Sequence, residues 1–266
     1  MNREWKAFVF GMIGVNLVLA LLLVLVYGGQ TQATLAALGA RVPLLLSGSP
    51  DFSSFEGGFV ANVAISLWAF LLAGVGGTAL GIALIAQSPY VSAPASLLMN
   101  ILRNSPWLVV LYAMLYLLPF EIDAFGTTLY LSPVVKSVIG LAFPVTANIA
   151  EVFRGGIEAI PSGQWESARA LGYRRLQILR YVVVPQALPL MTPNLMTTYA
   201  MLFIGTSLVV VTGAADVLSM ARTVIGSDGA HLATAVYIFV LFLFFVFAFP
   251  IAILTRWLER RVRVPS

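Results

Sequence analysis

Few side chains in this sequence could do covalent or metal chemistry. The 266 residues include no cysteine and a single histidine, His231, so neither a thiolate metal site nor a histidine cluster can form. The two lysines, Lys6 and Lys136, do not follow a glycine, so the chain has no GKS or GKT loop to hold the phosphates of ATP. We therefore expect no catalytic residue, no metal site and no cofactor on this chain.

Charged residues concentrate in one segment, residues 154–185, which reads RGGIEAIPSGQWESARALGYRRLQILRYVVVP. Its only acids are Glu158 and Glu166. Its arginines are Arg154, Arg169, Arg174, Arg175 and Arg180. Such side chains offer ion pairs and hydrogen bonds to a partner, which is docking chemistry rather than catalysis. Because a charge at the bilayer centre costs about 2.5–3.5 kcal/mol on insertion scales, this segment is expected in water, and its positive excess predicts the cytoplasmic side.

The rest of the composition is that of a membrane protein. Hydrophobic residues make up 60% of the chain and charged residues 10%, whereas a soluble domain has about 25% charged residues. Such a chain cannot cover a water-facing surface, so lipid is its expected solvent. The net charge is +4, but the basic residues lie mainly at the ends of apolar segments. That placement is a topology signal and argues against nucleic-acid binding.

Six apolar segments are long enough to cross a bilayer, which takes about 20 residues. They are Ala7–Tyr27, Phe59–Ala86, Ser92–Leu118, Ser132–Phe153, Leu188–Thr212 and Ala233–Trp257. The predicted fold class is therefore an all-α membrane protein, without strand alternation. Another apolar stretch, Thr31–Leu46, is broken by Arg41 and Pro43, is too short to span and is expected at the outer interface.

The arginines and lysines near short loops predict that both termini are cytoplasmic. Arg3 and Lys6 precede the first span, segment 154–185 separates the fourth from the fifth, and more arginines follow the sixth. The opposite loops are acidic: they hold Asp51, Glu56, Glu121, Asp123, Asp216 and Asp228, with Arg41 and Arg222 as exceptions. A cleaved signal peptide is the rival interpretation of the first span. Its apolar run is longer than the 7–15 residues of a signal core, so we expect it to be retained.

Two short helices are predicted inside segment 154–185. Ser162 is a candidate N-cap for the first, Gln164–Leu171, and Gly172 is its C-terminal stop. The second, Tyr173–Val184, leads to Pro185. Apolar residues recur at helical spacing, with Trp165, Ala168 and Leu171 on the first helix and Leu176, Leu179 and Val183 on the second. Two short amphipathic helices in water would form a compact docking surface.

The spacing of Glu166-Ser167-Ala168, three residues, Gly172, nine residues and Val182-Val183-Val184-Pro185 resembles the EAA loop of bacterial ABC importer permeases. The family pattern is Glu-Ala-Ala, three residues, Gly, nine residues, Ile, any residue, Leu and Pro. Residues 151–172 and 180–188 are similar to the polar amino-acid branch, as is RNSPWL at residues 103–108. The resemblance runs from about Phe59 to Val264, and residues 1–58 look like an added span and outer loop.

The resemblance implies a type I importer permease of the bacterial inner membrane, with residues 59–266 as its core. It implies a second permease subunit, the same or homologous, a dimer of ATP-binding cassette ATPases and an extracytoplasmic solute-binding protein. ATP and Mg would be bound by the ATPase. Helix Gln164–Leu171 would be the coupling helix that the ATPase grips. The residues assigned to coupling are Glu166, Ser167, Ala168, Arg169, Gly172 and Pro185.

Simpler explanations exist for the charges of this loop. Glu166 could only favour the positive end of a helix dipole, instead of holding a basic group of the ATPase. Arg169, Arg174 and Arg175 could be positive-inside anchors rather than ATPase contacts. Both pairs of explanations stay open at this point.

Polar residues inside spans are costly in lipid and are therefore candidates for the cargo path. The candidates are Asn62, Ser66, Arg103, Asn104, Asn148, Glu151, Asn194, Thr198, Thr206 and Ser207. Glu151 and Arg103 are taken as the only ionisable residues in or at the ends of the core helices, and they could instead form an ion pair. Thr206 and Ser207 could instead bond to carbonyls of their own helix.

The cargo itself is left open. Residues 203–208, FIGTSL, carry no charge, where the resembling branch has Lys-Asp before Thr-Ser-Leu. Charged contacts of that branch therefore cannot be carried over, and polar amino acids, opines and other modified amino acids are all candidates. A channel or secondary carrier that works without ATP is the alternative function, but it leaves segment 154–185 without a partner. A structural subunit of a larger membrane assembly is a third.

Overall fold

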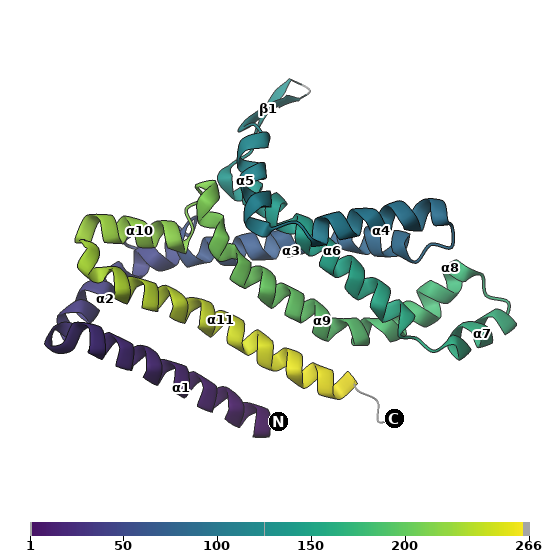
Figure 1. Ribbon diagram of the computed structural model, residues 1–266, viewed down its shortest axis with the longest axis horizontal. Coiled ribbons are helices and arrows are strands. Elements are labelled where there is room, and N and C mark those ends of the chain that lie inside the picture. The colour runs from purple at the N-terminus through teal and green to yellow at the C-terminus, as the bar shows by residue number, and fades with distance from the viewer. Residues whose placement is uncertain (1, 125, 263–266) are drawn as a thin grey trace.

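The computed structural model describes residues 2–124 and 126–262, which are almost entirely helical (Figure 1). The α-helices are α1 (Asn2–Tyr27), α2 (Thr31–Ser47), α3 (Gly58–Leu84), α4 (Pro89–Arg103), α5 (Trp107–Leu117), α6 (Pro133–Glu158), α7 (Ser162–Ala170), α8 (Arg175–Ile178), α9 (Val184–Gly205), α10 (Val217–Asp228) and α11 (Ala233–Val262). The tighter or wider turns are the 3₁₀ segments η1 (Gly28–Gln30), η3 (Thr206–Thr212) and η4 (Ala230–Leu232) and the π segment η2 (Leu179–Val183).

Within those residues, five helical stretches are long and apolar enough to cross a membrane. They are Val9–Ser47, Gly58–Leu84, Pro133–Glu158, Arg175–Thr212 and Ala230–Arg261. They correspond to the first, second, fourth, fifth and sixth predicted spans, although some of them start or end several residues away from the predicted bounds.

The predicted third span, Ser92–Leu118, is wrong as a single helix. The chain there forms α4 and α5, separated at residues 104–106 and each too short to cross a bilayer alone. Pro106 lacks a backbone N–H and disfavours helical geometry in the residue before it. Two carbonyls in the last turn of α4 accept hydrogen bonds from side chains at the break: Asn104 Nδ2 donates to Asn100 O at 2.7 Å and Ser105 Oγ to Ile101 O at 2.7 Å.

A short antiparallel hairpin follows α5, where the sequence predicts no strand. It consists of β1 (Glu121–Ala124) and β2 (Thr127–Tyr130), in the register Glu121↔Tyr130 and Ile122↔Leu129. The strands are too short and too polar for period-two alternation to stand out. Figure 1 shows the hairpin at the tip of α5, clear of the helix bundle.

Helices α3 and α6 form the centre of the bundle. They run parallel, since Gly76 lies against Thr146 and Gly81 against Phe153. The core around them is made by buried residues of both helices, such as Ile65 and Val145. Small residues permit this approach because they let two membrane helices come within backbone contact distance.

The close approach at Gly77 gives a direct test of this packing. A Cβ added there would lie 2.6 Å from Ile149 Cβ and 2.8 Å from the carbonyl oxygen of Thr146. Gly77→Ala is therefore expected to destabilise the fold by roughly 1–3 kcal/mol, measured as the free energy of unfolding in mixed micelles. Gly74→Ala is the matched control, because a Cβ at Gly74 would meet no atom within 4 Å. Equal stability of the two variants would contradict the packing described.

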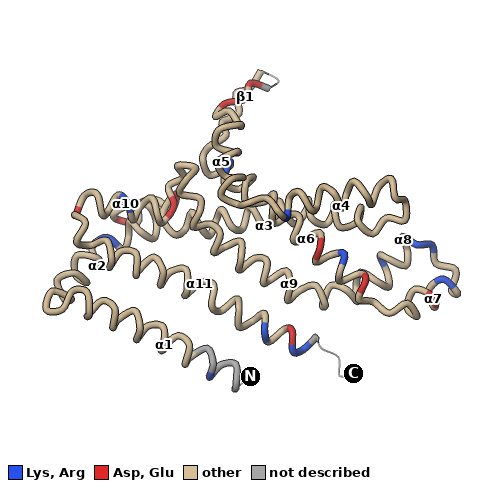
Figure 2. Tube along the Cα trace, in the orientation of Figure 1, with Lys and Arg blue, Asp and Glu red and all other residues tan. Residues whose placement is uncertain are grey.

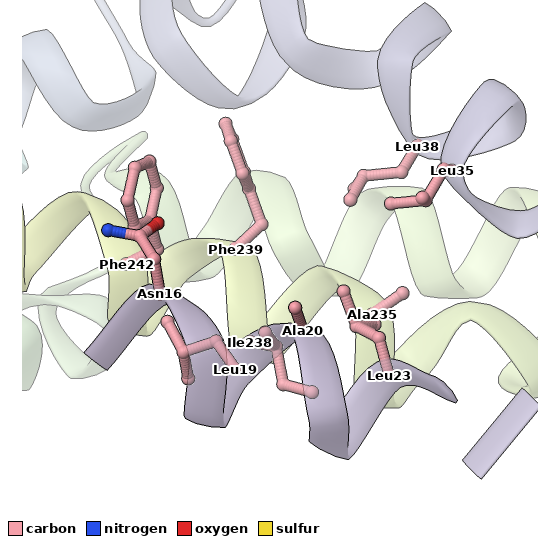
Figure 3. A pocket seen from close by; sticks show the side chains of 10 residues that line it. All are labelled: Asn16, Leu19, Ala20, Leu23, Leu35, Leu38, Ala235, Ile238, Phe239 and Phe242. Carbon is pink, nitrogen blue, oxygen red and sulfur yellow. The ribbon is translucent and has the colours of Figure 1, made fainter. Parts of the chain in front are cut away.

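The first two helices cover α11. α1 and α11 run antiparallel, since Gly11 lies against Phe249 and Tyr27 Oη donates to His231 O at 2.8 Å. Together with α2 they line a small apolar pocket of about 200 Å³ (Figure 3). Asn16 is the one polar side chain among its ten lining residues, and its amide bonds back to Met12 O of its own helix.

Helix α2 corrects the prediction of a broken segment, because it continues through both Arg41 and Pro43. Arg41 does not end the helix, since Asp228 of α10 neutralises it in a two-pronged pair, with Nε–Oδ2 at 2.7 Å and Nη2–Oδ1 at 2.6 Å. The hydrogen bond from Arg41 holds the pKa of the Asp228 carboxyl below its ordinary value. A lowered carboxyl pKa means that the pair persists at neutral pH and is lost only as the pH falls through that value.

Candidate functional site

The predicted cytoplasmic segment begins inside a helix. The sequence predicts that the fourth span ends at Phe153, but α6 continues to Glu158. Arg154 does not break it, because its guanidinium lies 2.6 Å from Glu151 Oε1 and 3.3 Å from Glu158 Oε1. Oppositely charged residues three and four apart stabilise a helix.

Helix α7 occupies the predicted coupling position. Pro161 is its N-cap, so Ser162 is the first helical residue and not the cap that the sequence predicts. Gly172 ends the helix as predicted, with φ at +81°. The end is a Schellman motif: Gly172 N–H donates to Arg169 O at 2.9 Å and Tyr173 N–H to Ala168 O at 3.1 Å. The left-handed conformation that this motif needs is open to glycine and costly for other residues.

The faces of the two loop helices are partly different from those predicted. Ala168 is buried against Ile157, Ile160 and Ile178, and Trp165 is half-buried there. Leu171 and Leu176, predicted to share the inner faces, are instead 78% and 76% exposed. Leu171 is the C-cap residue of α7, and Leu176 lies in the single turn of α8. The exposed side of the loop therefore combines these two leucines with exposed Glu166, Ser167 and Arg169.

The second loop helix is the beginning of the fifth span rather than a separate element. α8 passes into the π segment η2, and Val184 N–H then donates to Leu179 O, five residues back. α9 follows at once, with Pro185 in its first turn. The sequence predicts helix Tyr173–Val184 and a fifth span from Leu188, whereas the structure joins the two through Pro185. Proline has no backbone N–H to donate, and the wide π turn just before Pro185 accommodates that missing donor.

Basic residues gather around this end of the molecule (Figure 2). A pocket of about 470 Å³ lies beneath α7, lined by both acids and arginines, among them Glu158, Glu166 and Arg169. Arg175 closes its edge by donating from Nη2 to Ile85 O, at the end of α3, at 2.7 Å. The loop is therefore tied to α3 as well as to α6 and α9.

Four of the predicted cargo residues are buried within the bundle. Asn62 joins three elements: its Nδ2 lies 3.2 Å from both the carbonyl and the hydroxyl of Thr206, and its Oδ1 accepts from Val217 N–H at 2.9 Å. The Thr206 hydroxyl donates to Phe203 O of its own helix, which is the alternative that the sequence allows for this residue. The Thr198 hydroxyl likewise donates to Asn194 O. Ser66 donates to Val63 O of its own helix at 2.8 Å.

The other predicted cargo residues are more open. Asn104 and Asn194 are exposed, and Asn148 and Ser207 are half-buried. The structure thus does not bring the ten candidates together into one cavity. Those that line a common pocket are Arg103 and Glu151.

That pocket holds about 530 Å³ between the end of α3, α4 and α6. Arg103 and Asn100 of α4 face Glu151 and Arg154 of α6 across it. Glu151 pairs with Arg154, at 2.6 Å, rather than with Arg103. Arg103 makes no ion pair within the described residues. The pocket therefore places the guanidinium of Arg103 beside the ion pair of Glu151 and Arg154.

Lys136 is a charged residue inside a span, which the prediction of ionisable core residues left out. It lies in α6 inside the predicted fourth span, so Glu151 and Arg103 are not the only ionisable residues of the core helices. Its side chain is fully buried. A lysine within a span was itself the signal, since intramembrane charges are costly unless they have partners.

Comparisons with known proteins agree on one class. The family model described as "Binding-protein-dependent transport system inner membrane component" matches residues 76–264. A glutamate/glutamine/aspartate/asparagine transport system permease protein of Rhodobacter capsulatus is 32% identical over 253 residues, 94% of this chain and 56% of that protein, so the chain spans about half of its length. A probable amino-acid ABC transporter permease protein of Sinorhizobium fredii is 31% identical over 228 residues, 84% of this chain and 95% of that protein.

The fold is shared with a solved structure. The crystal structure of an amino acid ABC transporter with histidines has a TM-score of 0.69 and 24% identity, over 85% of this chain and 97% of that one.

Proposed function

The chain belongs to the family of binding-protein-dependent transport system inner membrane components, and from this membership we propose that it is the permease subunit of an ATP-driven importer of amino acids or related amino-acid derivatives. The observation that carries the proposal is the loop around α7, closed by a Schellman motif at the Gly172 of the EAA-like pattern. The names of the relatives support amino acids as the cargo class. The chain is a multi-pass inner-membrane protein.

The proposed partners follow from this role. A dimer of ATPase subunits, with ATP and Mg bound to it, docks on α7 from the cytoplasm, and Glu166 holds a basic group of its surface. A second permease subunit completes the pore, and an extracytoplasmic solute-binding protein delivers cargo. The exposed leucines at 171 and 176 support docking, because apolar side chains beside charged ones are typical of a protein interface.

The proposed topology places both termini and α7 in the cytoplasm. α4 and α5 together then cross the bilayer as a discontinuous span, since broken helices occur at membrane depth where they are buried in protein or line a cavity. The antiparallel course of α1 and α11 supports this arrangement, because it places the two chain ends toward the same side.

The experiment that tests the function is co-purification followed by transport. The tagged chain, extracted in mild detergent, should retain an ATPase subunit, and the reconstituted complex should take up amino acids only with ATP and the solute-binding protein present. Uptake without any ATPase subunit would instead favour a channel or secondary carrier.

The cargo pocket carries its own prediction. Arg103 is placed to bind the cargo carboxylate, so Arg103→Gln should lower the maximal uptake rate about tenfold, the loss expected for one charged hydrogen bond. The half-saturating cargo concentration should stay unchanged, because the solute-binding protein sets it. Arg256→Gln, at an exposed position outside both the pocket and segment 154–185, is the control. Equal uptake rates for the two variants would remove Arg103 from the cargo path.

A further inference from the structure

Lys136 holds the hairpin in place from inside the bundle. Its Nζ donates to Leu118 O at 2.6 Å and to Leu115 O at 3.2 Å, and it lies 3.4 Å from the centroid of the Phe120 ring. The last carbonyls of a helix lack partners within it and carry partial negative charge, so they suit an ammonium. Lys136 also lies in the first turn of α6, where the positive end of the helix dipole repels an ammonium. Its position is therefore explained by α5 and not by α6.

The element held in this way consists of α5 and the strands β1 and β2 that follow it. An isolated two-stranded hairpin is marginally stable in water. This one stands clear of the bundle (Figure 1). Lys136 and the bond from Leu131 N–H to Phe120 O, at 2.8 Å, fix its base. An exposed hairpin on a fixed base presents a surface to a partner.

The two faces of the hairpin differ in chemistry. The pair Ile122 and Leu129 makes one face apolar. The other face carries Glu121 and Asp123, both exposed, with Tyr130 paired opposite Glu121. Asp123 accepts from Thr128 Oγ1 at 2.7 Å, whereas the Glu121 carboxylate makes no hydrogen bond among the residues described. The polar face is therefore acidic and free to receive a basic partner.

The charge of this end of the molecule decides between partners. The hairpin lies at the end of α6 opposite α7, where the exposed carboxylates are Asp51, Glu56, Glu121 and Asp123. Arg222 is the exposed arginine there, and Arg41 is paired with Asp228. A second copy of the chain would bring the same acidic surface, and like charges placed together cost several kcal/mol. A basic surface on a different protein is complementary to it.

We propose that the acidic face of this hairpin, held by Lys136, is a docking site for a basic surface of the solute-binding protein. The proposal rests on the proposed function, which requires such a protein on this side of the membrane. Glu121 and Asp123 supply the ionic contacts, the hairpin supplies the shape, and Lys136 is a positioning residue that acts through α5.

The test is uptake by the full reconstituted transporter as a function of the concentration of its purified solute-binding protein. Glu121→Lys and Asp123→Lys should each raise the half-saturating concentration about tenfold, with the maximal rate retained, and should weaken its dependence on salt. Glu56→Lys makes the same charge change on the same side of the membrane and should raise the half-saturating concentration less than about threefold. Equal shifts for the three variants overturn the docking site and leave the proposed function intact, because uptake at saturation is unaffected.

A reporter on the hairpin separates the other occupants. The chain has no cysteine, so Tyr130→Cys gives a unique attachment point on the acidic face. In the transporter reconstituted in lipid, a spin label at this position should be mobile without the solute-binding protein and immobilised when that protein is added. Disulfide linkage of the introduced thiol between two copies in most molecules would show that the face joins permeases. A polarity-sensitive dye that reports an apolar environment without the binding protein would show that it lies in lipid. Either result overturns the proposal.

The positioning role of Lys136 is tested with the same spin label at residue 130. Lys136→Met should make the label more mobile and raise the half-saturating concentration, whereas Lys136→Arg, which retains the charge, should recover part of both. A structural role alone would lower the maximal rate and leave the half-saturating concentration unchanged.

Discussion

Gly172→Val should lower ATP-driven uptake about tenfold while the ATPase subunits still bind and still hydrolyse ATP. Gly172 has φ at +81°, and a Cβ there would meet no atom within 4 Å. The cost of the substitution is therefore entirely conformational. A residue with a side chain costs roughly 1–2 kcal/mol in the left-handed region, and a β-branched one more. Since 1.4 kcal/mol is about tenfold in an equilibrium, the turn that orients α7 is populated far less often.

Two variants separate this effect from a change in bulk. Gly163→Val adds the same side chain to α7, also in open space, but at an ordinary φ, and should transport nearly as the parent does. Gly172→Asn should retain most uptake, because asparagine tolerates the left-handed region. Uptake and ATP hydrolysis are measured on the same reconstituted complex. If Gly172→Val matches Gly163→Val in the ratio of uptake to hydrolysis, α7 is not the coupling helix.

Asn62→Ala should destabilise the protein by about 3 kcal/mol, since each buried polar group left without a partner costs roughly 1–3 kcal/mol. The amide of Asn62 is fully buried and bonds both the carbonyl and the hydroxyl of Thr206 and the N–H of Val217. Removing it leaves the first turn of α10 and the start of η3 without these bonds. The free energy of unfolding in mixed micelles is the measurement.

Ser66→Ala is the matched control one turn along α3. The Ser66 hydroxyl bonds its own helix at Val63 O and makes only a longer contact, 3.3 Å, to Tyr199 Oη. Its loss should cost less than about 1 kcal/mol. A stable Asn62→Ala variant with altered cargo selectivity would return Asn62 to the cargo path, which is still a prediction from the sequence.

The sequence predicts the class, the long helices and the loop because the signals involved are local or compositional. Apolar length, arginine placement and the spacing from Glu166 to Gly172 are all readable along the chain. The end of α6 was readable too: Glu151, Arg154 and Glu158 are spaced three and four apart, which extends a helix. The cargo residues remain predictions, since the structure spreads them over several sites.

The misses depend on contacts that no local pattern encodes. Prolines 43, 144 and 250 lie inside helices, whereas Pro106 follows a break. At the break, side chains of Asn104 and Ser105 bond carbonyls of the last turn of α4, a contact that apolar periodicity does not reveal. Lys136 was missed because its partners are backbone carbonyls of another helix, about twenty residues earlier in the chain.

The unbroken course from α8 through η2 into α9 has a mechanical consequence. A joint between the docking loop and the fifth span would dissipate any displacement imposed on the loop. Here Arg175–Thr212 is one helical stretch, so it connects the loop directly to Thr206, which bonds Asn62 near the start of α3. Gly172 lies just before this stretch, and it is the point where α7 can change its angle to it. Under the proposed function, a displacement of α7 by the ATPase would therefore enter the bundle through this stretch, with Gly172 as the turn that sets the angle of α7 to it.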